Sequence, residues 1–154
     1  MIISKSRNYV FVHIPKTGGT ALTLALEDRA AADDIIIGDT PKAKRRKKRL
    51  NALTAKGRLW KHSTLADIDG ILSPEELEQM FCVTLVRNPW DRAVSYYHWL
   101  RAQTFEHRAV ALAKQVEFEP FVRNEITVKA LRSWPAAAYM RDITGVERCA
   151  KYIR

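Results

Sequence analysis

The residues best suited to chemistry lie near the start of the chain, in the segment His13–Thr20, which reads His-Ile-Pro-Lys-Thr-Gly-Gly-Thr. Glycines let a backbone close around a ligand, and the first N–H groups of a helix, together with its dipole, favour an anion. Lys16 adds a mobile cation, and Thr17 and Thr20 add hydroxyl donors. The segment predicts a cradle for a phosphate-like group beside an ammonium; the alternative is a plain glycine turn before a helix.

A second group of candidates follows the apolar run at residues 81–86. Arg87 stands at the end of this run, and Ser95 lies about two turns into the helix predicted after it. Arginine offers a planar fork of donors that suits phosphate, and serine adds a hydroxyl. A second anion site would suit a nucleotide with two separate phosphate groups. The alternative is an arginine at a strand end and a solvated helix serine.

Regular elements are predicted on both sides of each group. Residues 9–14 and 81–86 read as buried strands, while residues 19–32 and 90–101 have the spacing of helices. Strands that alternate with helices predict an α/β fold with a mainly parallel sheet. Ligands bind such sheets beyond the carboxyl ends of the strands, so both groups are expected on one rim.

The rest of the chain adds further elements but no repeat. The segment 42–49 is a block of basic residues, which are usually solvated or mobile, so residues 40–58 are predicted as a basic, mobile loop in a single domain over 1–154. Further helices are predicted at Ser73–Met80, 106–116, 118–124 and 136–142, and further strands at 35–37, 59–64 and 149–154.

Composition limits the class of protein. The 154 residues are 47% hydrophobic and 28% charged, as in globular domains, and the net charge of +9 implies anionic partners. No apolar run approaches the roughly 20 residues that cross a bilayer, and the start lacks a signal-peptide pattern. Cys82 and Cys149 have no metal-ligand spacing. A reducing cytoplasm is expected, with association to a membrane surface as the alternative.

Together, the two groups resemble the sulfotransferases that use 3′-phosphoadenosine 5′-phosphosulfate (PAPS). His13–Thr20 resembles their loop for the 5′-phosphosulfate, and residues 86–97, with Val-Arg-Asn-Pro and Ser-Tyr-Tyr, resemble their 3′-phosphate segment. The likeness is greatest to the carbohydrate branch, the heparan and chondroitin type, and to a bacterial-type short member or a fragment. It implies a P-loop NTPase-like three-layer fold that lacks the C-terminal elements of the family.

The resemblance also implies roles for single residues. Lys16 would stabilise charge on the bridging oxygen as the sulfuryl group leaves, and Arg87 with Ser95 would hold the 3′-phosphate. The donor would be PAPS, no metal would be needed, and the acceptor would be a hydroxyl of a carbohydrate-like molecule, anionic ones included; nucleic acid is not expected. The residues implied in donor binding are Pro15, Lys16, Thr17, Gly18, Gly19, Thr20, Ala21, Arg87 and Ser95.

A general base for the acceptor hydroxyl is sought between the two motifs. His62 is the candidate because histidine titrates near working pH and the resembled enzymes often use a histidine there. An ordinary loop histidine is the alternative, and Asp67 is the reserve base. His13 is expected to satisfy nearby backbone. Four aromatic residues are expected in the core, or one of them against adenine: Trp90, Tyr96, Tyr97 and Trp99.

Two rival functions stay open. A kinase-like phosphotransferase would need a lysine after the glycines and a magnesium-binding aspartate at a strand end, and neither is evident. A non-catalytic module that binds polyanions or nucleic acid would rest on the net charge and the block at 42–49. The acceptor and the oligomeric state are not specified by the sequence.

Overall fold

A computed structural model describes residues 1–154 and divides the chain into two compact units. The first, which we call the sheet unit, contains Met1–Val86 and Ala136–Arg154. The second, the helical unit, contains Arg87–Pro135. Each unit is described by itself.

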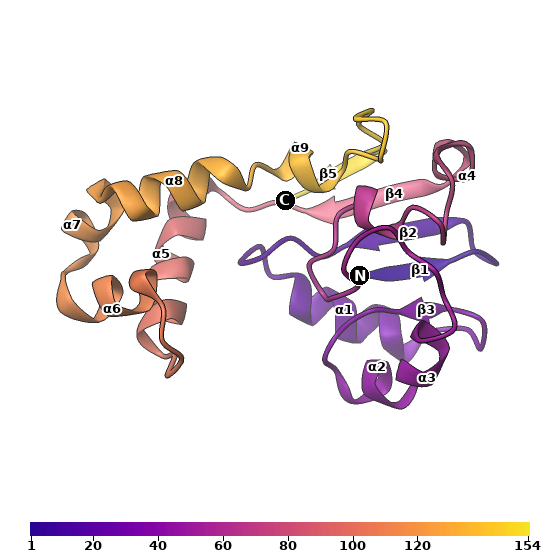
Figure 1. Ribbon diagram of the computed structural model, residues 1–154, viewed down its shortest axis with the longest axis horizontal. Coiled ribbons are helices and arrows are strands. Elements are labelled where there is room, and N and C mark those ends of the chain that lie inside the picture. The colour runs from indigo at the N-terminus through magenta and orange to yellow at the C-terminus, as the bar shows by residue number, and fades with distance from the viewer. The chain divides into compact units, whose positions relative to one another are not determined.

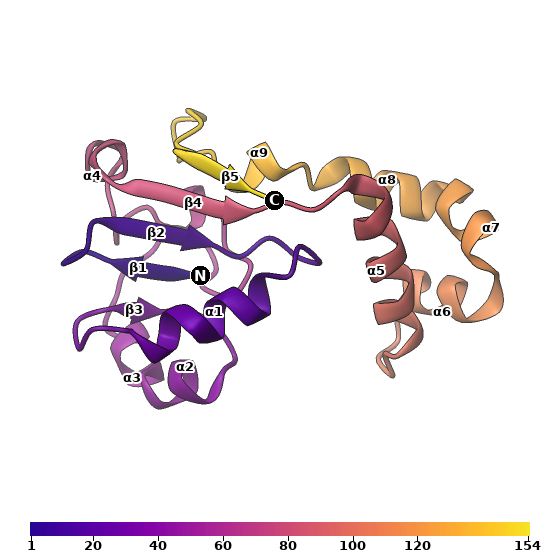
Figure 2. The same ribbon diagram turned by 180° about the vertical axis from the view of Figure 1, so that it is seen from behind.

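The sheet unit is built on five strands in the order β3-β1-β2-β4-β5. Strand β1 is antiparallel to both of its neighbours, whereas β2, β4 and β5 run parallel (Figures 1 and 2). The fold is therefore mixed α/β with a parallel centre. The strands are β1 (Ile2–Ser4), β2 (Tyr9–Val12), β3 (Ile35–Ile36), β4 (Phe81–Leu85) and β5 (Lys151–Ile153).

Alternation along the strands gives the sheet two apolar faces. Ile3 and Val10 belong to one buried cluster, and their neighbours Ile2 and Phe11 to another, which Leu22 of the first helix also joins. Burial on both sides explains why the strand sequences are continuously apolar. The helices of this unit are α1 (Gly19–Asp28), α2 (Pro41–Arg45), α3 (Lys47–Leu50), the 3-10 turn η1 (Ala66–Ile68), α4 (Pro74–Gln79) and α9 (Ala136–Tyr139).

The helical unit has its own apolar core. Tyr97 and Leu100 of its longest helix pack with Val110 and Phe121 from the helices that follow. The Tyr97 hydroxyl donates to the carbonyl of Val116 at 3.0 Å, which satisfies the polar end of a buried ring. Its helices are α5 (Pro89–Arg101), α6 (Arg108–Gln115), α7 (Phe118–Arg123) and α8 (Glu125–Ser133).

Most of the predicted elements are present at or near their predicted places. The Ser73 capping box starts α4 as its sequence indicates. The short strand β1 and helix α8 were not predicted, and the basic block holds helices α2 and α3. No helix has the length and apolar character that a membrane crossing requires.

Candidate active site

The segment between β2 and α1 forms a tightly closed loop. Its backbone passes through the left-handed region at Lys16 (φ 66°) and again at Gly18 (φ 88°). The buried Thr17 hydroxyl donates to the carbonyl of Ile14 at 2.9 Å, which draws the loop back toward the end of β2. Thr17 thus holds the shape of the loop as well as lining it.

The conformation of Lys16 is unusual for a residue with a side chain. Left-handed backbone costs an L-residue roughly 1–2 kcal/mol, and strained residues of this kind cluster at functional sites. Gly18 adopts the same region at the N-cap of α1, where no side chain caps the helix. The start of α1 therefore keeps the positive end of its dipole beside a half-buried lysine, an arrangement that suits an anion.

Gly19 is required by close packing. It begins α1 with its backbone against the imidazole of His13, and a Cβ at this position would overlap that ring. His13 is itself buried, and burial and the neighbouring His62 hold its pKa at about 3. The His13 ring is therefore neutral, and its packing against Gly19 sets the position of the first turn of α1. The sequence predicted only that His13 satisfies nearby backbone groups.

His62 is brought to this loop from another part of the sheet unit. Its Nδ1 lies 2.8 Å from the carbonyl oxygen of His13, and the two rings meet edge to face with centroids 4.8 Å apart. A carbonyl oxygen only accepts, so Nδ1 carries the proton and Nε2 of the neutral ring keeps its lone pair. Burial lowers the pKa of His62 below its usual value of 6.5. Its state at neutral pH is that of a base.

The segment that carries His62 is a turn, so the strand predicted at residues 59–64 is wrong. The hydroxyl of the fully buried Ser63 accepts from Trp60 N at 2.9 Å, and its one proton is shared between the carbonyls of Arg58 and Trp60, which lie 2.9 and 2.8 Å away. Such local bonds compete with strand pairing. Trp60 packs edge-on against His62, with centroids 5.0 Å apart.

The carboxylate of Asp67, the reserve base, is already hydrogen-bonded within its own turn. One carboxylate oxygen accepts from Thr64 N at 2.7 Å and from the Thr64 hydroxyl at 2.9 Å, and Gly57 packs against the same side chain. This carboxylate fixes the turn before η1, which leaves His62 as the better candidate. Beside His62, Lys61 pairs with Asp39 at 2.7 Å.

The second motif begins where β4 ends. Strand β4 pairs in parallel with β2, so both strands finish at the same edge of the sheet. Arg87 is the first residue of the helical unit and is exposed, and Ser95 is half-buried in α5. Arg92 donates to the carbonyl of Trp134 at 3.1 Å.

The aromatic residues of α5 divide into two groups. Tyr96 and Tyr97 are buried, as predicted, but the prediction that Trp90 and Trp99 are core residues is wrong, since their exposed fractions are 79% and 40%. The helix turns its buried stripe toward α6 and α7, and Trp90 in the first turn falls outside that stripe. Trp90 is thus an exposed ring three positions after Arg87.

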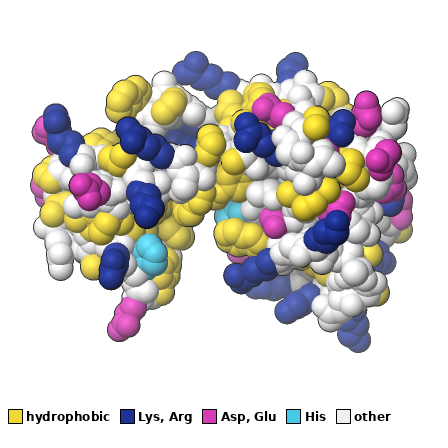
Figure 3. All heavy atoms as spheres, turned by 45° about the horizontal axis from the view of Figure 1, so that its top comes forward, with side chains coloured by type: hydrophobic (Ala, Val, Ile, Leu, Met, Phe, Trp, Pro, Cys, Tyr) yellow, Lys and Arg dark blue, Asp and Glu magenta, His cyan; other side chains and the backbone are white.

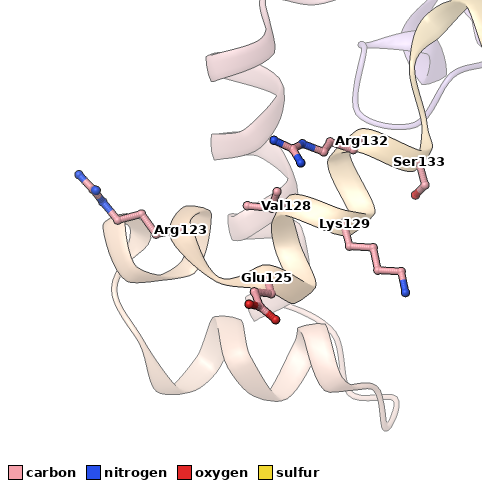
Figure 4. A pocket seen from close by; sticks show the side chains of 6 residues that line it. All are labelled: Arg123, Glu125, Val128, Lys129, Arg132 and Ser133. Carbon is pink, nitrogen blue, oxygen red and sulfur yellow. The ribbon is translucent and has the colours of Figure 1, made fainter.

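A shallow pocket of about 560 Å³ lies on α7 and α8, and its lining includes none of the residues predicted for the site. Figure 4 shows that its basic side chains point in different directions. Arg123 pairs with Glu119 at 3.0 Å. The pocket offers charge but no convergent set of donors. Its lining residues are Arg123, Glu125, Val128, Lys129, Arg132 and Ser133.

The structure therefore gathers one half of the predicted site within the sheet unit: the loop from Pro15 to Ala21 and, through His13, His62. Arg87 and Ser95 belong to the helical unit. Sequence reasoning underrated His13 and Trp60. The signal for His13 was its place directly after a buried strand and six residues before a glycine that begins a helix.

Comparison with known proteins gives one match. The sequence profile described as the sulfotransferase family matches residues 1–141. No curated protein and no solved structure matches the chain.

Proposed function

Because this chain belongs to the sulfotransferase family, we propose that it transfers a sulfuryl group from PAPS to a hydroxyl of a carbohydrate-like acceptor. The family generally uses PAPS as its donor. The observation that carries the proposal is the loop at residues 13–21, where a lysine and a helix start are held together in a strained, closed backbone.

In this proposal the loop binds the 5′ end of the donor. The Thr20 hydroxyl and the backbone from Thr17 to Ala21 would hold the 5′-phosphate at the start of α1. Gly18 and Gly19 suit this role because the first has open space around it and the second lies flat against His13. Lys16, which follows Pro15 in the loop, would place its ammonium where negative charge develops on the bridging oxygen.

The acceptor is activated by His62 in the same scheme. The acceptor oxygen attacks sulfur, the bond between sulfur and the bridging oxygen of the phosphate breaks, and Nε2 of His62 takes the hydroxyl proton. The neutral ring and the Nδ1 bond to the His13 carbonyl support this role, since they leave Nε2 as the basic atom. Position and charge stabilisation supply most of the rate, as in phosphoryl transfer.

Arg87 and Ser95 complete the proposal by holding the 3′-phosphate. The exposed guanidinium of Arg87 would suit the 3′-phosphate, and the exposed ring of Trp90, in the first turn of α5, would suit the adenine ring. The residue pattern supports the carbohydrate branch and a P-loop-like three-layer fold. We also propose a cytoplasmic location for the protein.

Calorimetry with adenosine 3′,5′-bisphosphate and with ADP tests the donor class. Both ligands carry two phosphoryl groups on adenosine, but only the bisphosphate has one on the 3′ oxygen, so a preference for the bisphosphate reports a site for the 3′-phosphate. We expect the bisphosphate to bind at least about tenfold more tightly, since a hydrogen bond to a charged group contributes about 1.5–3 kcal/mol. Equal affinities would overturn the PAPS proposal and favour a kinase-like phosphotransferase.

A further inference from the structure

The basic residues at positions 42–49 divide into two groups with different surroundings. Three of the seven donate to backbone carbonyls at the C-terminal end of α1 and in the turn after it. Cations at this end of a helix offset its dipole and satisfy its last carbonyls. The pairs are Lys42 to Glu27 O, Arg46 to Ala31 O at 2.9 Å and to Asp34 O at 3.0 Å, and Arg49 to Ala32 O.

The other four basic residues form what we call the basic face. Their side chains are exposed and make no hydrogen bond or ion pair with the protein. Asp39 forms its ion pair with Lys61, and the pKa of this carboxyl is lowered mainly by that hydrogen bond and only slightly by the charge of Lys44. Four like charges on adjacent turns repel one another without internal compensation. The basic face consists of Lys44, Arg45, Lys47 and Lys48.

Packing holds the basic face in place. Ala43 is buried in the sheet core, and Leu50 packs against the other core cluster. Thr40 caps α2 by accepting from Ala43 N at 3.1 Å, and its hydroxyl donates to the buried carboxylate of Glu27 at 2.7 Å. Helices α2 and α3 are thus hydrogen-bonded to the end of α1 by Lys42, Arg46 and Arg49, while the four cations of the basic face are exposed to solvent. Figure 3 shows dark-blue side chains gathered along the lower margin of the sheet unit.

The basic face lies apart from the glycine loop within the sheet unit. The loop precedes the N-terminus of α1, whereas α2 and α3 are fastened to its C-terminal end (Figures 1 and 2). A helix of 10 residues is about 15 Å long. A ligand that touches both the loop and the residues that bond α2 and α3 to the end of α1 must span about this length, which a single sugar does not.

The surroundings of the basic face favour one class of anion. Residues 39–59 contain no aromatic side chain, so nothing there stacks on the bases of a single-stranded nucleic acid. Leu50 and Leu53 pack against the core and are not presented for insertion into a membrane. A polymer bearing sulfate or carboxylate groups needs only an array of exposed cations.

We infer that the basic face binds an anionic polysaccharide, holding a long acceptor at a distance from the reacting hydroxyl. This inference rests on the proposed function, because the polysaccharide is taken to be the acceptor. It predicts that affinity depends on chain length, since a chain of several sugars can contact the basic face and the loop together and a single sugar cannot.

The test compares two variants with the same loss of charge. In the first, the four residues of the basic face become glutamine. The second is a control in which Arg108, Lys114, Lys129 and Arg132, exposed residues of the helical unit, become glutamine. Binding is measured by calorimetry to heparin, to a heparin disaccharide, to uncharged dextran and to a DNA duplex. Thermal unfolding and binding of adenosine 3′,5′-bisphosphate are measured on both variants.

We expect the first variant to bind heparin at least about tenfold more weakly than the unmodified protein and to lose its preference for heparin over the disaccharide. The control should stay within about threefold. Equal loss in both variants would show a general charge effect and overturn the inference, as would unchanged binding in the first. Binding of the duplex as tight as that of heparin would overturn the choice of polysaccharide. Retained bisphosphate binding separates these failures from a failure of the proposed function.

Discussion

The two motifs differ in how the protein holds them. The glycine loop is shaped by packing: Gly19 lies on the His13 ring, and Thr17 bonds the carbonyl of Ile14. The start of α5 is open, with Arg87 and Trp90 exposed and Asn88 capping the helix through Trp90 N at 2.9 Å. A change in the loop therefore alters a preformed geometry, whereas a change at α5 removes a side chain and leaves the backbone as it was.

Loss of the loop cation has the largest expected effect. Lys16→Ala should lower kcat by about 10²–10³-fold, because it removes the charge proposed to stabilise the transition state. Binding of adenosine 3′,5′-bisphosphate, measured by calorimetry, should change much less. Lys114→Ala, at an exposed lysine of α6, is the control. Transfer at the normal rate in Lys16→Ala would refute the role of this lysine.

The second effect is on proton transfer. His62→Gln should lower kcat about 100-fold, within the range of general base catalysis. Burial lowers the pKa of His62, so the unmodified enzyme should keep its activity from neutral pH down to below 6.5 and lose it as the ring gains a proton. A pH profile of kcat/KM checks this, and His98→Gln, at an exposed histidine of α5, is the control. An acid limb that persists in His62→Gln would assign the base elsewhere.

At the open motif the expected effect is on selectivity. Arg87→Ala should weaken binding of adenosine 3′,5′-bisphosphate by about 10–100-fold while the affinity for ADP stays the same, because only the former carries a 3′-phosphate. Stability should not change, since Arg87 is exposed. Arg123→Ala on α7 is the control. An equal loss of both ligands would remove Arg87 from the proposed 3′-phosphate site.

The smallest effect tests the packing itself. Gly19→Ala should reduce the free energy of unfolding by about 1–3 kcal/mol, because the new Cβ overlaps His13, although alanine ordinarily favours a helix. Gly18→Ala meets no atom and should show only the cost of its left-handed backbone. Urea unfolding measures both. If His13→Ala combined with Gly19→Ala gives no recovery, the loop is not held by this contact.

Much of the fold follows from local patterns in the sequence. Continuous apolar runs predict β2 and β4, and the Ser73 capping box predicts α4. Strand β1 was missed because three residues at a chain end carry little periodic signal, and α8 because the adjacent β-branched residues Ile126, Thr127 and Val128 disfavour a helix. Helices α2 and α3 were missed because a run of like charges is expected to repel itself and stay unfolded. In the structure, contacts with the end of α1 hold this segment in a helical conformation.

The sequence by itself determined the glycine loop, its lysine and the arginine after β4, because these signals are short and local and each one sits at a predicted strand end. Only the tertiary structure decided that His13 supports Gly19 and fixes the proton on Nδ1 of His62, and that Asp67 is occupied by backbone. These relations join residues up to 49 positions apart, and chain folding, not spacing, brings them together.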